Sequence, residues 1–129
     1  TMVLVLMGCG SAALPDTQIV AVCGDGSFQM SLMELATMRQ WNLPIKFVIM
    51  RNGYLGLVRE YQHHTYHDRY SGVSLDGSPD FEKIADAYGL DYFHLEHNDE
   101  MEQRIDEFLA CEHAAMMVCE VYSFDLVKE

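Results

Sequence analysis

Short apolar runs alternate along the chain with stretches whose apolar residues recur at helical spacing. Residues 19–23 form one such run, which ends at a glycine, and residues 45–50 form another, which is followed by Asn52-Gly53. Apolar runs of this length between turn residues are typical of buried strands. Two further runs, at residues 92–96 and 115–121, bring the number of predicted strands to four.

Helical patterns separate these strands. The first covers residues 30–41 and is apolar around most of its circumference. The second follows Ser78-Pro79-Asp80, with the serine as capping residue and the proline at the first helical position, and ends at Gly89. The third starts near Asn98 and continues to residue 109. Because most crossovers have about ten or more residues, this order predicts an α/β fold: a three-layer, doubly wound parallel sheet with helices on both faces.

The longest stretch without apolar periodicity runs from residue 64 to residue 77. Loops of that length in compact domains are often functional. Around its start, His63 and His67 stand four positions apart, a spacing that would let two histidines share a metal on a helix. Only Asp68 is close enough in sequence to complete such a site, so an exposed, mobile loop is the favoured interpretation.

With 129 residues, half of them apolar, the chain is long enough for one compact domain with its own core. Its four cysteines show no CxxC spacing, which predicts a reduced, cytoplasmic protein. Residues 2–7 are apolar but too few for a signal peptide or a membrane span, so no membrane partner is expected. The chain begins at Thr1 and runs straight into apolar sequence, which suggests a piece of a longer protein.

The net charge of -12 arises entirely after residue 60. Residues 1–60 hold 4 acidic and 4 basic residues, whereas the remainder holds 16 acidic and 4 basic residues. Nucleic acids are bound by clustered Lys and Arg, so this distribution argues against a nucleic-acid partner. An acidic surface that favours solubility is the simplest explanation.

Candidate chemistry lies at two strand ends. In an open parallel sheet, ligands bind at the carboxyl ends of the strands. Asp25 follows the first predicted strand and Asn52 follows the next, 27 positions later, so their oxygens could converge in one crevice. A carboxylate with an amide oxygen is a hard ligand set, which suits Mg²⁺ or Ca²⁺ and is poor for zinc.

Two glycines flank the aspartate. Gly24 and Gly26 would let a ligand approach the backbone closely, and the amides of Ser27 and Phe28 could receive an anion. These features predict a metal-bridged phosphate site. On spacing alone, a tight turn with a solvated aspartate is an equally good explanation.

The wider sequence resembles a known family. Gly24-Asp25-Gly26, the separation of 27 positions and the terminal Asn52 resemble the thiamine-diphosphate-binding motif, which begins GDG and ends NN. Similarity to the C-terminal domain of the acetolactate synthase large subunit extends over GDGSFQMSLMELATMRQWNLPIKFVIMRNGYLGLVREYQ and PDFEKIADAYG. The resemblance covers residues 19–120 and is most specific in its first half.

The resemblance implies a thiamine-diphosphate-binding fold with a site that holds the diphosphate through Mg²⁺. Asp25, the side-chain oxygen of Asn52 and the main-chain carbonyl of Tyr54 would be the metal ligands. The positions expected to contact the cofactor are Gly24, Gly26, Ser27, Tyr54, Gly56, Leu57 and Met7. No catalytic residue is expected in this chain, because the family's activating glutamate comes from another domain across a dimer interface.

Two positions and one spacing depart from the family pattern. Arg51 replaces the first asparagine of the NN pair, which would add a cation near the diphosphate without removing the metal ligand. Tyr61 stands where the biosynthetic enzymes usually carry a tryptophan that shapes the pocket for the second keto acid, so a preference for 2-ketobutyrate stays open. Met7 would support the bent cofactor, yet only 18 positions separate it from Asp25. That is about seven fewer than usual, close to two helical turns, so residues 1–18 are either a shortened helix or a segment that is not homologous in structure.

We therefore expect residues 1–129 to be a single C-terminal, thiamine-diphosphate-binding domain of a larger enzyme that is inert when isolated. By resemblance, that enzyme decarboxylates pyruvate and joins the product to a second 2-keto acid, in branched-chain amino acid biosynthesis. FAD, if used, would be bound only in the full-length parent. The missing domains, in a homodimer or higher homo-oligomer, would cover an exposed apolar face through which the isolated chain self-associates. Two alternatives are a domain of a related 2-keto acid decarboxylase and a non-catalytic cofactor-binding or assembly module.

Overall fold

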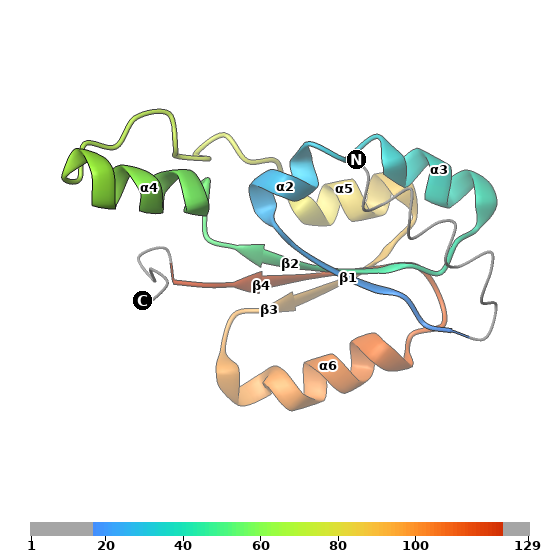
Figure 1. The fold of residues 1–129 in the computed structure, drawn as a ribbon. Coiled ribbons are helices and arrows are strands. Elements are labelled where there is room, and N and C mark those ends of the chain that lie inside the picture. Colours follow the sequence, from blue (N-terminus) through green and yellow to red (C-terminus); the bar gives the residue numbers. More distant parts are fainter. Residues whose placement is uncertain (1–16, 123–129) are drawn as a thin grey trace.

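Four parallel strands form the centre of the part of the chain that the computed structural model describes, residues 17–122. They are β1 (Val20–Gly24), β2 (Lys46–Arg51), β3 (Asp91–Leu95) and β4 (Ala115–Glu120). The strands pair in the order β1-β2-β4-β3, and every pair is parallel (Figure 1). The predicted strands and the predicted parallel sheet are therefore confirmed.

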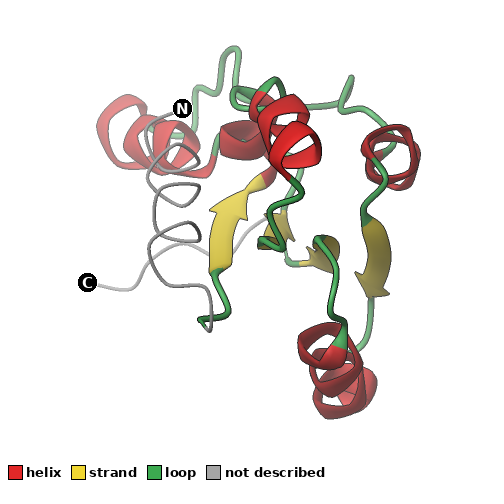
Figure 2. Cartoon of the chain, turned by 90° about the vertical axis from the view of Figure 1, so that its right-hand side faces the viewer, coloured by secondary structure: helices red, strands yellow, loops and turns green. Residues whose placement is uncertain are grey.

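Helices cover both faces of this sheet. On one face lie α2 (Asp25–Gln29), α3 (Glu34–Trp41) and α5 (Phe81–Tyr88), and on the other lies α6 (Met101–Ala110), which follows the short 3-10 helix η1 (Asn98–Glu100) (Figure 1). The view turned by 90° again has helices above and below the strands (Figure 2). The predicted three-layer α/β fold is confirmed. Within residues 17–122, every helix is too short or too polar to span a bilayer.

Two apolar clusters pack against the sheet, one on each face. The larger lies beneath α2, α3 and α5 and contains Ala21, Phe28, Leu35, Met38, Ile45, Phe47, Ile49, Phe81, Ala85, Leu90, Met116 and Val118. The smaller lies beneath α6 and contains Leu95, Phe108, Ala115, Met117 and Cys119. Because alternate side chains of β4 enter opposite clusters, this central strand is apolar at consecutive positions rather than at every second one.

Only the second part of the helix predicted at residues 30–41 is helical: residues 30–33 form a turn, which separates α3 from the short helix α2 before it. Met30 caps the end of α2, and α3 begins only at Glu34. The turn directs Met30 and Met33 into solvent, with exposed fractions of 72% and 71%, while Phe28 of α2 takes the buried position. An apolar circumference therefore did not distinguish the turn at residues 30–33 from the first turn of a helix.

The cap of α5 was predicted too early in the chain. Asp80 is the N-cap, and its side chain accepts a hydrogen bond from the backbone N–H of Lys83 at 3.2 Å. The hydroxyl of Ser78 instead accepts a hydrogen bond from Nε2 of Gln29 at 3.1 Å, which ties this segment to α2. Serine and aspartate are about equally good caps, so local sequence could not choose between them.

Helix α4 (Gly56–Tyr66) was not predicted. It lies beyond the carboxyl end of β2 (Figure 1), and Arg59 is its buried residue. Its apolar side chains stay in solvent, Leu57 with an exposed fraction of 82%, so they form no buried stripe for a periodicity search to find. Residues 64–66, predicted as loop, belong to its last turn, and the irregular stretch covers only residues 67–77.

A buried lysine joins the sheet to helix α6 at the amino ends of the strands. Lys46 begins β2 and has an exposed fraction of 1%. Its Nζ donates to the carbonyl oxygens of Leu109 and Cys111, at 2.7 and 2.6 Å, where α6 ends. Burial lowers the pKa of Lys46. The two carbonyls, which the end of a helix leaves without intrahelical partners, offset the cost of burying this group.

Lys46→Met should lower the free energy of unfolding by about 2 to 4 kcal/mol, because methionine fills similar space but leaves two buried carbonyls without a donor. Arg39→Met is the matched control, since Arg39 also donates to a carbonyl, that of Ala87 at 2.8 Å, but from an exposed position. It should cost less than about 1 kcal/mol. Urea unfolding followed by circular dichroism measures both, and equal losses would contradict the proposed role of Lys46.

Candidate cofactor site

A cavity of about 430 Å³ opens at the carboxyl ends of β1 and β2. It is lined by Gly24, Asp25, Gly26, Ser27, Met50, Asn52, Tyr54, Leu55, Gly56, Leu57, Val58 and Val121. The structure therefore brings together every predicted site residue that it describes. Met7, the remaining predicted position, lies outside the described residues. The roles assigned to these residues as metal and cofactor ligands stay predictions.

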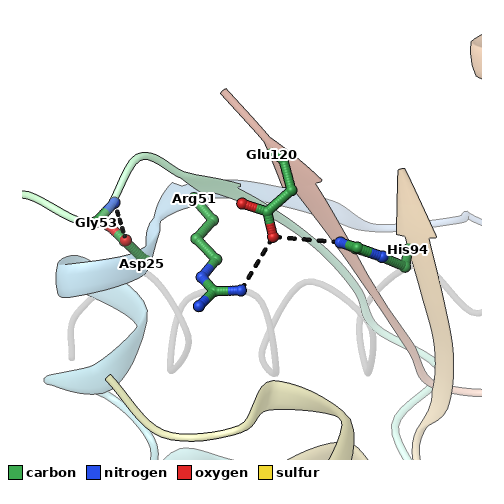
Figure 3. Close-up of polar contacts among 5 residues, drawn as sticks. All are labelled: Asp25, Arg51, Gly53, His94 and Glu120. Carbon is green, nitrogen blue, oxygen red and sulfur yellow. Dashed lines mark hydrogen bonds and ion pairs between the residues drawn. The ribbon is translucent and has the colours of Figure 1, made fainter. Parts of the chain in front are cut away.

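Asp25 connects the ends of the two strands. It has an exposed fraction of only 1%, which contradicts the alternative of a solvated turn aspartate. Its Oδ1 accepts a hydrogen bond from the N–H of Gly26 at 2.9 Å, and its Oδ2 accepts one from the N–H of Gly53 at 2.8 Å (Figure 3). Gly53 has a φ of +72°, a left-handed conformation that glycine adopts at little cost.

Asn52 forms a turn at the end of β2. Its Oδ1 accepts a hydrogen bond from the N–H of Tyr54 at 2.9 Å, so the side chain takes the place of a main-chain acceptor. Its Nδ2 lies against the start of α4, 3.2 Å from the position that a Cβ at Gly56 would occupy. The amide of Asn52 is thus packed between its own turn and the helix that follows.

A short antiparallel bridge holds the start of α4 against the irregular stretch that follows the helix. The N–H of Leu55 donates to the carbonyl of Val73 at 2.9 Å, and the N–H of Leu75 donates to the carbonyl of Gly53 at 2.8 Å. The backbone after Asn52 is therefore fixed by main-chain contacts as well as by Asp25.

Gly26 occupies a position where a side chain does not fit. A Cβ there would lie 2.8 Å from Cδ2 of Leu55 and 3.2 Å from Cδ1 of Leu75. At Gly24, by contrast, a Cβ would have no atom of another residue within 4 Å. Packing within the protein therefore requires a glycine at position 26 but not at position 24, and the close approach of a ligand to these glycines stays a prediction.

The donor atoms fit a hard divalent cation. The oxygens of Asp25 and Asn52 each accept one backbone hydrogen bond and keep a second lone pair. Within residues 17–122, no three or more His, Cys, Asp or Glu side chains are grouped to hold a metal. A cation at this cavity would depend on one carboxylate, neutral oxygens and exogenous ligands, which is the usual pattern for Mg²⁺.

The two candidate histidines are not arranged as a metal pair. Helix α4 ends at Tyr66, and His67 follows in a left-handed conformation with a φ of +50°. His63 instead pairs through Nδ1 with Asp68. Hydrogen bonds from Tyr70 and His63 lower the pKa of the Asp68 carboxyl. These contacts anchor the residues after α4 to the helix.

The two departures from the family motif that the structure describes do not line the cavity. Arg51 extends toward β4, where its Nη1 donates to Oε1 of Glu120 at 3.0 Å (Figure 3). Tyr61 lies on α4 with an exposed fraction of 59%. The Arg51 guanidinium is therefore engaged by an acidic side chain, and a cation near the diphosphate stays a prediction.

Sequence reasoning missed several apolar residues of the lining and one buried cation. The missed lining residues are Met50, Leu55, Val58 and Val121. Val121 directly follows β4, so no local pattern could connect it with Asp25. Arg59 has an exposed fraction of 5%, and its guanidinium carbon lies 4.2 Å from the ring centroid of Tyr54, which favours cation–π attraction.

Comparison with known protein families identifies the family to which the chain belongs. The family model for the thiamine pyrophosphate enzyme, C-terminal TPP binding domain, matches residues 5–121. The chain belongs to this family. The thiamine pyrophosphate enzyme domain thus has the fold and the cavity expected from its GDG motif, and the resemblance noted in the sequence is confirmed.

Several relatives of this thiamine pyrophosphate enzyme domain are acetolactate synthases. It is 38% identical over 110 residues to the acetolactate synthase of Arthrospira platensis, a match that covers 84% of the chain and 19% of the relative. It is 40% identical over 97 residues to the acetolactate synthase isozyme 3 large subunit of Escherichia coli (strain K12), covering 75% of the chain and 17% of the relative. The chain therefore spans less than a fifth of the length of these relatives.

Gly26→Ala should lower the free energy of unfolding by about 1 to 3 kcal/mol, because the added methyl group overpacks Leu55 and Leu75. Gly24→Ala is the matched control: Gly24 has a φ of -79°, which alanine also adopts, and open space around the added atom. It should change stability by less than about 0.5 kcal/mol. Denaturant unfolding of both variants measures the difference. A loss at position 26 no larger than that at position 24 would mean that the leucines move aside freely.

Proposed function

We propose that this domain binds the diphosphate of thiamine diphosphate through Mg²⁺, with Asp25, the side-chain oxygen of Asn52 and the main-chain carbonyl of Tyr54 as metal ligands. The observation that supports this most directly is the buried carboxylate of Asp25 in the wall of the cavity. Burial of a carboxylate is costly unless other groups compensate its charge. Two backbone N–H groups compensate it in part, and a divalent cation would complete the compensation.

The rest of the lining would bind the phosphate oxygens. Gly56 and Leu57 open α4, and the first N–H groups of a helix have no intrahelical acceptor. Together with the amide of Ser27, these are donors suited to an anion. The bare backbone at Gly24 would leave room for it, Gly26 would contact it through its backbone, and Met7 would support the bent form of the cofactor.

Thiamine diphosphate, when bound, supplies the carbanion chemistry by which a 2-keto acid loses carbon dioxide and donates its remaining carbons to an acceptor. The residues of this chain would contribute anchoring and orientation rather than proton transfer. Of the lining residues within 17–122, Asp25 is the one carboxylate, none is a histidine or lysine, and metal coordination would occupy Asp25. Groups that move protons would therefore come from the missing domains.

The proposal for the whole enzyme is an acetolactate synthase that condenses pyruvate with a second 2-keto acid, in the cytoplasm and in branched-chain amino acid biosynthesis. Identities of 38% and 40% to proteins of that name support it. FAD would be bound, if at all, by other parts of the parent. In a homodimer or higher homo-oligomer, the missing domains would cover the exposed apolar side chains of α4, namely Leu57, Val58 and Tyr61.

Asp25→Ala should abolish Mg²⁺-dependent binding of thiamine diphosphate, because it removes the one carboxylate of the lining together with the contact to Gly53. Isothermal titration calorimetry with and without Mg²⁺ measures this. The wild-type chain should release binding heat only when Mg²⁺ is present, and equal heats with and without the metal would rule out a metal bridge.

Asp106→Ala is the control for Asp25→Ala, because Asp106 is an exposed aspartate on α6, on the other face of the sheet. It should bind like the wild type. Circular dichroism should verify that Asp25→Ala remains folded, so that lost binding reports the site and not the fold.

The isolated chain of 129 residues should form no acetolactate from pyruvate, even with thiamine diphosphate and Mg²⁺ present. Among the described residues, the cavity lining holds one carboxylate, which is the proposed metal ligand, and no histidine or lysine. Colorimetric detection of acetolactate after prolonged incubation provides the measurement, and product formation above a protein-free blank would contradict the proposal. With the full-length parent, acetaldehyde in place of acetolactate would instead favour a decarboxylase.

A further inference from the structure

Three polar side chains meet beside the cavity, at the carboxyl ends of three neighbouring strands. Arg51 is the last residue of β2, Glu120 is the last residue of β4, and His94 lies near the end of β3. Oε1 of Glu120 lies 3.0 Å from Nη1 of Arg51 and 3.2 Å from Nε2 of His94 (Figure 3). One carboxylate oxygen thus connects β2 and β3 across the strand between them.

Aromatic rings hold two members of this cluster in place. The guanidinium carbon of Arg51 lies 6.0 Å from the ring centroid of Phe81, the first residue of α5. Tyr92 stacks on the ring of His94, with centroids 6.4 Å apart and an angle of 19° between planes. The strands therefore fix the backbone of the cluster, and the rings of Phe81 and Tyr92 pack against its Arg51 and His94 side chains.

Exposed ion pairs usually stabilise little, because two flexible side chains must be ordered for a screened attraction. Here Arg51 and Glu120 are half-exposed but directly opposite each other in the strand register. The N–H of Val121 also donates to the carbonyl of Arg51 at 3.0 Å. Because the backbone already aligns the two residues, the side-chain contact requires less ordering than a typical surface pair.

Arg51 directly precedes Asn52, so anything that fixes residue 51 limits where Asn52 can lie. On its other side, Asn52 is followed by Gly53, whose N–H is held by Asp25 at 2.8 Å. The residues on both sides of Asn52 are therefore held by contacts with other parts of the chain. Gly53 donates a hydrogen bond to Asp25, and Arg51 pairs with Glu120.

We propose that Arg51, Glu120 and His94 form a clamp across β2, β4 and β3 that fixes the position of Asn52 at the cavity, with Glu120 as a positioning residue. The clamp acts on Asn52 through the side chain and the backbone of Arg51. Its consequence for metal affinity rests on the proposed function, whereas its consequence for the order of the strand ends does not.

The test uses Glu120→Ala in the full chain, with two readouts. Calorimetry with saturating thiamine diphosphate should give a dissociation constant for Mg²⁺ raised by about tenfold, the lower end of the effect expected for residues that orient a metal ligand. Amide hydrogen exchange followed by NMR should be faster at Gly53 and Val121. Glu120→Gln keeps an oxygen acceptor for Arg51 and should restore binding to within about threefold of the wild type.

Glu107→Ala is the matched control, since it removes a similarly exposed pair, with Arg104 at 3.3 Å, on α6. It should leave both readouts unchanged. Arg51→Met tests the same contact from the other side. The double variant with Glu120→Ala should be no weaker than either single variant, because both remove one interaction.

Wild-type Mg²⁺ affinity in Glu120→Ala, or multiplying losses in the double variant, would overturn the clamp. If the wild-type chain itself binds no Mg²⁺ with thiamine diphosphate, the proposed function fails instead. In that case the amide hydrogen exchange rate of Gly53 tests the clamp by itself. A rate in Glu120→Ala equal to that of the wild type overturns the clamp, and a faster rate supports it.

Discussion

The buried carboxylate of Asp25 is the contact on which the geometry of the cavity depends. Parallel pairing of β1 with β2 ends at Gly24 and Met50, and the hydrogen bond from Gly53 to Asp25 continues the connection beyond that point. It holds together two turns that would otherwise diverge as the strands leave the sheet. Contacts within the chain therefore fix the floor of the cavity, which lowers the entropic cost of binding a ligand.

The amino ends and the carboxyl ends of the strands differ in what they contact. At the amino ends, Lys46 binds the end of α6 and closes the fold with a cation that is almost fully buried. At the carboxyl ends, the strands end in a cavity lined by glycines, by Asp25 and by exposed apolar residues. Stability and binding are thus assigned to different ends of the same strands, as in other open parallel sheets.

The sequence was sufficient to predict the sheet and the convergence of Asp25 with Asn52, because buried parallel strands are marked by continuous apolar runs and topology places their carboxyl ends together. It was insufficient for α4, whose apolar residues face solvent and therefore lack the periodic burial that a core imposes. It was also insufficient for Val121 and Glu120. Glu120 lies beside Arg51, and Val121 lines the same cavity as Asp25, because β4 lies between β2 and β3 in the sheet. No local pattern encodes that order of strands.

The antiparallel bridge beside the cavity closes a loop at its base. It joins the backbone of residues 53–55 to that of residues 73–75, while residues 56–72 form the helix and turn between. Since the bridge uses main-chain groups, it is indifferent to most side chains within the loop, and closure entropy grows only slowly with loop length. The position of the turn carrying Asn52 therefore depends on the main-chain closure of the loop more than on the side chains beyond Val58.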